Sequence, residues 1–404
     1  MREKNGRLLR SLNVENILEM LYLLAFVLFV AYMFLETTMW EIHWPGKYMD
    51  GLLCILASLI LGRVCFSKNY SVKETVFAVI LTVVLLYAWK QNGYVELYYL
   101  LLMILGAKDI SEKKLMKVYF GITIVLFAIV IVLALTGKIE NLVYYQEGHR
   151  TRMALGIYYP TDFSAHVFFC SLVYVFIREE KLRWFEVMGI LLVGTGAFWI
   201  TDARMNFLCT LLFCAGLFLY LFYRKYCRKK GKPVSIPTWM SYIAALMPVL
   251  CAGSMILLTV LYTRSSHWLG VFNRLINARL SFGKAGIDQY GFSNWGQYVE
   301  MIGGGKSVET KTNYFFIDCS YVSGLLRWGN IAFAVILFVM LIICYKARKE
   351  NRWVFLWVMV LISIQCSIEH HLIEIAYNPF LWLLFAKEAE KDDTKVFKRA
   401  GGAR

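Results

Sequence analysis

The sequence predicts an all-α, polytopic membrane protein: a single integral membrane domain over residues 1–404, built as a helical bundle of about 12 transmembrane helices. Hydrophobic residues make up 59% of the chain and charged residues 18%, whereas a soluble domain is nearer half apolar and a quarter charged. Apolar runs long enough to cross a bilayer recur along the chain, and basic residues are distributed between them with a clear bias. These observations exclude an ordinary soluble domain and a disordered chain.

The apolar runs define the predicted spans in chain order. Most approach the length of about 20 residues that a bilayer-crossing helix needs. The fourth and the twelfth are short, so they would have to tilt, borrow flanking residues or thin the bilayer. The predicted spans cover residues 16–35, 48–64, 74–89, 95–107, 118–136, 161–177, 185–201, 206–223, 238–262, 329–345, 353–369 and 372–386.

The distribution of basic residues predicts the orientation. The chain carries 43 lysines and arginines against 28 acidic residues, a formal charge of +15. If the N-terminus is cytoplasmic, about 30 of these 43 residues fall in inner segments, and both termini are cytoplasmic. The basic run 224–232 then faces the anionic lipid of the inner leaflet. The lipid bilayer, and no nucleic acid, is therefore the expected partner of this charge.

The polar chemistry gathers on the predicted outer side. All 6 histidines map there, and so does the longest connection, about 263–328 between spans 9 and 10, which is expected to carry short helices. A connection of this length is usually functional. Gly303 to Ser307 resembles the end of a phosphate-binding loop, but Glu300 stands where that pattern needs glycine. No cofactor is therefore expected, and the energy for a reaction would come from an activated substrate.

Four outer arginines run against the charge bias and are candidates for binding an anion. Arg150 and Arg152 lie in the loop before span 6. Arg204 lies in the short turn after span 7, and Arg279 lies in an amphipathic stretch of the long connection. Arginine suits a diphosphate because its planar fork makes bidentate contacts. The alternatives are solvated loop arginines paired with nearby glutamates and, for Arg204, a simple ion pair with Asp202.

Acidic residues and histidines at two span ends are candidates for acid–base chemistry. Asp318 precedes span 10, where it would also be a good helix N-cap. Glu369, His370 and His371 lie at the end of span 11. Adjacent histidines on a helix diverge by about 100°, so we expect no metal here. Ligand binding, proton transfer and interfacial packing all stay open for this cluster.

Four motifs follow one another over residues 140–386. They are Asp202-Ala203-Arg204; Asn277 to Lys284 with Tyr290-Gly291 and Trp295-Gly296; Asp318 to Tyr321 with Gly329; and Glu369 to Leu381. In this order they resemble the O-antigen and capsular polysaccharide polymerase family (Wzy-like), which is related to the O-antigen ligases. The first resembles the family's Ser-Arg turn, the second the arginine-centred start of its large outer loop, and the last two the loop's exit and the closing segment.

The resemblance implies a metal-independent membrane glycosyltransferase, a polymerase of bacterial surface polysaccharide. Such an enzyme joins undecaprenyl-diphosphate-linked repeat units at the outer face of the plasma membrane. Its partners would be the lipid-linked oligosaccharide and the bilayer, with a chain-length regulator and a flippase as further candidates. The residues that the resemblance implies are Arg204 and Arg279 for the diphosphate, Asp318, His370 and Glu369 for catalysis, and Tyr290, Tyr321 and His371 for the glycan. Arg152 and Arg150 join the diphosphate set because they are outer arginines that run against the charge bias.

Two departures from the family pattern leave alternatives open. Ala203 stands where the Ser-Arg turn has serine, and Asp318 stands where the ligases have histidine. The base is therefore either Asp318 or the Glu369/His370 pair. The alternative functions are transfer of a finished glycan to another acceptor, as in a ligase, and flipping or export of a lipid-linked glycan.

Overall fold

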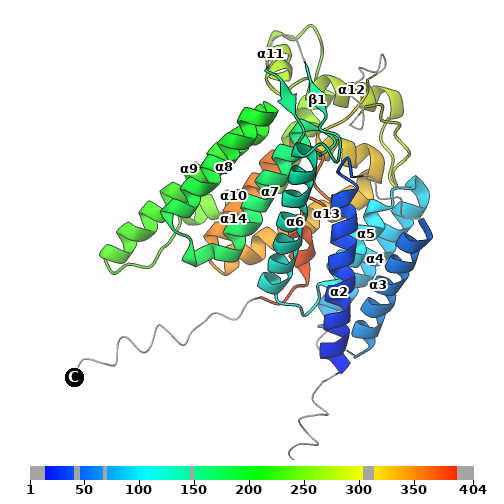
Figure 1. The fold of residues 1–404 in the computed structure, drawn as a ribbon, viewed down its shortest axis with the longest axis vertical. Helices are drawn as coiled ribbons and strands as arrows, with labels where there is room; N and C mark the ends of the chain where they lie inside the picture. Colours follow the sequence, from blue (N-terminus) through cyan, green and yellow to red (C-terminus); the bar gives the residue numbers. More distant parts are fainter. Residues whose placement is uncertain (1–13, 41–45, 67–70, 146–149, 304–313, 389–404) are drawn as a thin grey trace, which may run out of the picture.

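The computed structural model describes residues 14–40, 46–66, 71–145, 150–303 and 314–388. In these ranges the chain is almost entirely helical, and most of its long helices run side by side (Figure 1). The α-helices are α2 (Val14–Leu35), α3 (Gly46–Phe66), α4 (Val72–Asn92), α5 (Glu96–Gly106), α6 (Glu112–Leu135), α7 (Pro160–Arg178), α8 (Trp184–Thr201), α9 (Arg204–Lys229), α10 (Thr238–Val260), α11 (His267–Leu275), α12 (Arg279–Tyr290), α13 (Ser320–Lys349) and α14 (Trp353–Cys366). Short elements complete the fold: an antiparallel ribbon of β1 (Val143–Tyr144) and β2 (Arg152–Met153), and the 3-10 helices η1 (Glu179–Lys181) and η2 (Phe380–Leu384).

Eight helices within the described ranges are long and apolar enough to cross a membrane: α2, α4, α6, α7, α8, α9, α10 and α13. The prediction of a polytopic helical membrane protein is confirmed at this level, and eight of the twelve predicted spans coincide with helices that meet this standard in the described ranges. Helices α5 and α14 are apolar but shorter. Large apolar side chains such as Leu24, Val83 and Leu219 are exposed on the outside of the bundle, as expected of a surface that faces lipid.

The last predicted span, 372–386, is not an α-helix. Helix α14 ends at Cys366, and the chain continues as turns to Pro379 and then as η2. Asn378-Pro379 prevents a continuous helix because proline lacks the amide proton and clashes with the preceding turn. Residues 371–385 are almost all buried, and irregular backbone is tolerated at membrane depth only where protein or a cavity surrounds it. The apolar run therefore reflects burial in protein and not contact with lipid.

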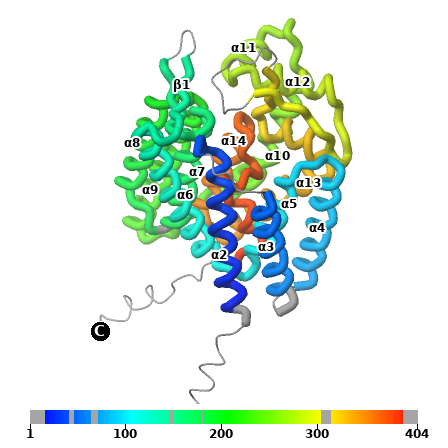
Figure 2. The backbone as a smooth tube through the Cα atoms, turned by 45° about the vertical axis from the view of Figure 1, so that its right-hand side comes forward, coloured from blue at the N-terminus to red at the C-terminus, as the bar shows by residue number. Residues whose placement is uncertain are grey.

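This irregular segment lies at the centre of the molecule. Figure 2 shows α14 and the chain that follows it between a group formed by α6 to α9 and a group formed by α3 to α5. Helix α14 packs against α7, α9, α10 and α13. Residues 367–379 therefore project from the middle of the bundle toward its upper end in Figure 1.

The connection between α10 and α13 covers the upper end with α11 and α12, as expected for the long connection (Figure 1). Helix α13 begins at Ser320, earlier than the predicted start at 329, and it is kinked at Gly329 (φ 84°, ψ 164°). Gly296, also left-handed (φ 85°), lies against this kink, and Gln297 N donates to Arg327 O at 3.3 Å. The close approach of two backbones leaves no room for a Cβ at either glycine.

The other end of the bundle is held by a buried ion-pair network. Arg352, between α13 and α14, lies 2.7 Å from Glu112 Oε1 through Nη2 and 2.8 Å from Glu179 Oε1 through Nε. Lys346 Nζ donates to Leu384 O at 2.8 Å. These contacts connect α6, η1, α13 and η2, so they fix the start of α14 and thereby the position of the segment beyond it.

Candidate functional site

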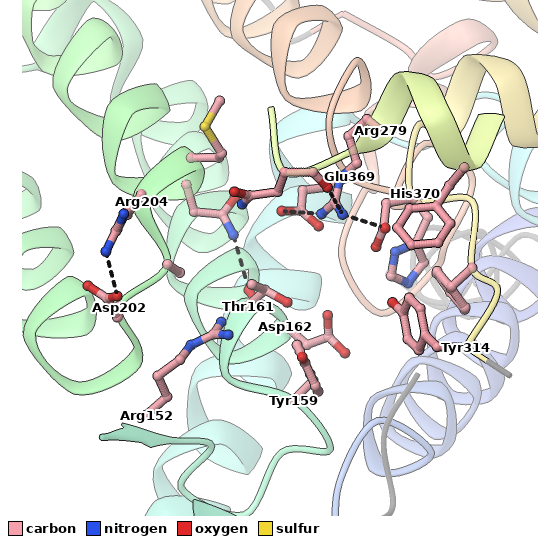
Figure 3. Close-up of a pocket in the computed structure, with 17 residues that line it drawn as sticks. Arg152, Tyr159, Thr161, Asp162, Asp202, Arg204, Arg279, Tyr314, Glu369 and His370 are labelled. Atoms are coloured by element: carbon pink, nitrogen blue, oxygen red, sulfur yellow. Dashed lines mark hydrogen bonds and ion pairs between the residues drawn. The ribbon is translucent and has the colours of Figure 1, made fainter. Parts of the chain in front are cut away.

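A polar cavity of about 440 Å³ opens at the upper end of the bundle (Figure 3). Its walls come from α7, α9, α12, the segment before α13 and the turn after α14. The lining residues are Arg152, Tyr159, Thr161, Asp162, Asp202, Ala203, Arg204, Met205, Asn206, Asn277, Arg279, Phe282, Tyr314, Phe316, Asp318, Glu369 and His370. The cavity thus collects three of the four predicted diphosphate arginines and all three predicted catalytic residues from distant parts of the chain.

Arg279 lies between two carboxyl groups in this cavity. Its Nη1 is 2.6 Å from Asp318 Oδ2 and its Nη2 is 3.9 Å from Glu369 Oε1. The contact with Asp318 lies off the N–H direction, so it is an ion pair and not an aligned hydrogen bond. Arg279 Nε donates to Ile368 O at 3.0 Å. The side chains of Arg279 and Asp318 are each 12% exposed, so both are largely desolvated and still reach the cavity.

Local backbone geometry places Arg279 at the start of α12. Asn277 and Ala278 both have left-handed backbones (φ 52° and 65°), which turn the chain sharply between α11 and α12. Asn273 Oδ1 accepts from the amides of Leu280 and Ser281 at 3.0 and 3.1 Å, so it caps the first turn. The guanidinium is consequently aimed inward, toward the turn after α14.

The two carboxyl groups beside Arg279 are balanced between their charged and neutral forms. Burial raises the pKa of Asp318 to about 6, while the Arg279 charge acts to lower it. Burial also raises the pKa of Glu369 to about 7, again against the effect of Arg279. One guanidinium cannot fully compensate two desolvated carboxylates, so the pKa values of both carboxyl groups lie above their usual range. This is the electrostatic condition for acid–base work.

Arg204 lines the opposite wall and is held by Asp202. Asp202 ends α8 with a left-handed backbone (φ 48°, ψ 31°), and its side chain is only 4% exposed. Its Oδ2 is 3.4 Å from Arg204 Nη2, and its Oδ1 is 3.0 Å from Arg150 Nη2. The expected neighbour pair with Arg204 is therefore present, while 59% of the Arg204 side chain stays exposed. Arg150 contacts Asp202 but does not line the cavity.

Arg152 completes the basic part of the lining from β2. Its Nε donates to Thr201 O at 2.8 Å, and its guanidinium carbon lies 5.6 Å from the ring centroid of Tyr159. Figure 3 shows Arg152, Arg204 and Arg279 on different sides of the same space. Neighbouring His149 lies outside the described residues.

The three predicted glycan residues do not line the cavity. Tyr321 is fully buried, and its hydroxyl donates to Ser363 O at 2.9 Å, so it has no surface to offer a sugar. His371 is also fully buried. Tyr290 is half-buried, and its hydroxyl accepts from the Glu300 amide at 3.3 Å. The motifs that contain Tyr290 and Tyr321 do not determine the direction in which these side chains point.

Four aromatic lining residues, Tyr159, Phe282, Tyr314 and Phe316, are not among the predicted site residues. Tyr159 follows the arginine loop before α7, and Tyr314 and Phe316 come just before Asp318. The sequence signal was their closeness to candidate charged residues, because aromatic faces commonly line sugar and lipid sites. The ring of Phe316 meets that of His370 edge to face, with centroids 5.2 Å apart.

Chemically, the cavity offers three arginines in different surroundings, two carboxyl groups with raised pKa values, and aromatic side chains in its lining. Such a set can bind an anion and can accept or supply a proton beside it. Comparison with known proteins found no match: no family model, no curated protein and no solved structure is similar to this chain.

Proposed function

We propose that this protein is a membrane glycosyltransferase that joins lipid-diphosphate-linked glycan repeat units, a polymerase of bacterial surface polysaccharide. The observation that carries the proposal is the contact between Arg279 and Asp318 at 2.6 Å inside a cavity of about 440 Å³. A cation that binds a leaving diphosphate and a carboxylate that accepts a proton are the two groups such a transfer needs. The resemblance to the Wzy-like family supports the same reading.

In the proposed reaction, the diphosphate of the donor lipid takes Arg279 and Arg204 as its partners. Binding of the diphosphate draws Arg279 away from Asp318 and leaves this carboxylate free to act as the base. The acceptor hydroxyl oxygen then forms a bond to the anomeric carbon, and its proton passes to Asp318. The bond from the anomeric carbon to the diphosphate oxygen breaks, and the diphosphate leaves with the electron pair, stabilised by the arginines.

The proposed setting is the bacterial plasma membrane, with the cavity on the outer side and both termini in the cytoplasm. The charge bias of the connecting segments supports this orientation. A flippase that delivers the lipid-linked unit and a chain-length regulator are the proposed partners. No nucleotide is needed at the outer face, because the lipid diphosphate is already an activated leaving group.

A binding measurement tests the proposal before any chemistry. Purified protein is titrated with undecaprenyl diphosphate and with undecaprenyl monophosphate. We expect tighter binding of the diphosphate, lost in Arg279→Ala and retained in Arg150→Ala, because Arg150 lies outside the cavity lining. Equal binding of both lipids by wild type and Arg279→Ala would contradict the proposal.

Two alternative functions would use the same lipid-linked substrate. A ligase would use the same donor and a different acceptor, so only the product distinguishes it from a polymerase. A lipid-linked glycan flippase is favoured by one observation: residues 367–379 form irregular buried backbone inside the bundle, a feature typical of transport proteins. Lipid translocation in sealed vesicles without formation of a glycosidic bond would favour the flippase.

A further inference from the structure

A second polar cluster adjoins the floor of the cavity. Asp162 comes from α7, and His370, His371 and Glu374 come from the turn after α14. The two imidazole rings have centroids 4.3 Å apart. The expectation that these histidines diverge assumed a helix through them, but α14 ends at Cys366. The turn instead brings both rings to the same side, and Figure 3 shows His370 and Asp162 at the cavity.

Glu374 orients both histidines. Its Oε2 lies 2.7 Å from His371 Nδ1, and its Oε1 lies 3.4 Å from His370 Nε2. His371 is 0% exposed, and its Nε2 has no hydrogen-bond partner among the described residues. That nitrogen is 3.9 Å from Asp162 Oδ1. A carboxylate that holds the Nδ1 proton leaves the Nε2 lone pair free, which is the arrangement found behind metal-ligating histidines.

Carboxyl groups surround Asp162 in this cluster, while the charges of Arg327 and Arg279 act on His370. The main electrostatic neighbours of Asp162 are the carboxyl groups of Glu374, Glu369 and Asp318. Arg279 contacts Glu369 and Asp318, so its positive charge is paired with these two carboxyl groups. No salt bridge joins Asp162 to a lysine or arginine within the described part of the chain. A buried group of this composition is stabilised by a bound cation.

We propose that Asp162, His370 and His371 bind one divalent transition-metal ion. Zn²⁺ is the ion that this ligand set fits. One carboxylate oxygen and one nitrogen from each imidazole lie within 4.8 Å of one another. Two imidazoles and a carboxylate are a known ligand set for zinc sites that keep an open position. Glu374 is a positioning residue behind them. Asp162 and His370 line the cavity, so the open position faces it.

The proposal is confined to this ligand set. Asp318, Glu369 and His370 also lie within 4.8 Å of one another, but Arg279 already supplies a positive charge there. The proposal departs from the metal independence that the family resemblance implies. It does not rest on the glycosyltransferase proposal, because metal binding is measured without any substrate.

The test uses the purified full chain, stripped with a chelator and titrated with Co²⁺ and then Zn²⁺. Cobalt absorption reports the ligand type, and competition with a chromophoric chelator gives the zinc affinity. We expect one equivalent per chain with nitrogen and oxygen ligands. Asp162→Asn and His371→Gln should abolish it, and Glu374→Gln should weaken it about 10- to 100-fold. His267→Ala, an exposed histidine on α11, is the matched control and should bind as wild type does.

Three results would overturn the proposal: no bound equivalent in wild type, unchanged affinity in folded Asp162→Asn, or a cobalt spectrum with the charge-transfer band of a cysteine thiolate. Gel filtration and a thermal melt establish that each variant is folded. If His371→Gln does not fold, Asp162→Asn decides the question, because its carboxylate lies at the cavity wall and the change conserves its size.

Discussion

Two largely buried arginines at opposite ends of the bundle each contact carboxyl groups, Arg279 two of them and Arg352 three, yet only Arg279 faces a large cavity. Arg352 and Arg279 are both 12% exposed. Arg352 binds Glu112 and Glu179 through four contacts of 2.7 to 3.3 Å. Arg279 has one short contact to Asp318 and a looser one of 3.9 Å to Glu369.

The spaces beside the two arginines differ as much as their contacts do. The space beside Arg352 measures about 20 Å³, too small for a substrate, while that beside Arg279 measures about 440 Å³. A guanidinium whose N–H groups are paired with protein carboxylates stabilises the fold. A guanidinium that shares an open space with incompletely compensated carboxyl groups is available for a ligand.

The largest expected effect is on folding, at the closed end. Arg352→Ala removes the partner that contacts the buried Glu112 at 2.7 Å and the buried Glu179 at 2.8 Å, and breaking a buried ion pair costs about 3–5 kcal/mol. We expect a marked loss of folded protein in the membrane, measured by gel filtration in detergent. Arg348→Ala is the control, because Arg348 bonds Ser241 and stacks on Tyr242 and has no carboxylate partner among the described residues. Equal yields of both variants would contradict the structural role assigned to Arg352.

At the open end, the largest effect falls on turnover. Asp318→Asn removes the proposed base but keeps the side chain's size, so chain extension on purified lipid-linked substrate should fall about 10²- to 10⁴-fold. Folded yield should not fall. Full turnover in this variant would exclude Asp318 as the base and direct attention to Glu369 and His370.

The pH dependence of the wild-type rate is a second test of Asp318 as the base. The pKa of Asp318 is raised by burial to about 6, and a base must be unprotonated to work. The rate should therefore rise as pH increases through about 6, and below that pH it should fall about tenfold per unit. The residual rate of Asp318→Asn should lack this step. A wild-type rate that is flat between pH 5 and pH 7 would contradict the assignment.

A smaller effect is expected from the carboxylate that positions Arg204. Asp202→Asn keeps the shape of the turn after α8 but weakens the hold on Arg204 and Arg150. We expect the apparent affinity for the donor to fall about tenfold, with the pH profile unchanged. A change in the pH profile would mean that Asp202 itself exchanges the proton.

The smallest effect is expected for Arg150, whose side chain is 41% exposed and lies outside the cavity lining. Exposed ion pairs contribute about 0–1 kcal/mol, so Arg150→Ala should change the extension rate by no more than about threefold. A loss as large as that of Arg279→Ala would show that the diphosphate reaches beyond the cavity described above.

The sequence anticipated most of this arrangement, for physical reasons that can be named. Long apolar runs and charge bias predict helices such as α6 and α10, since both signals act over about 20 residues. Arg204, Arg279 and Asp318 were singled out because charge at the outer ends of spans needs a reason. The buried turn after Cys366 was not predicted, because an apolar run buried in protein resembles one that faces lipid. The side-chain directions of Tyr290 and Tyr321 depend on tertiary packing, which their motifs do not report.

The most direct measurement of the central claim is chain extension by the purified protein on undecaprenyl-diphosphate-linked repeat units. Products are followed by mass spectrometry, with Arg279→Ala and Arg150→Ala measured beside the wild type. We expect lengthened lipid-linked glycan with release of undecaprenyl diphosphate for the wild type and Arg150→Ala, and none for folded Arg279→Ala. Equal extension by Arg279→Ala, or no glycosidic bond formed by the wild type, would contradict it.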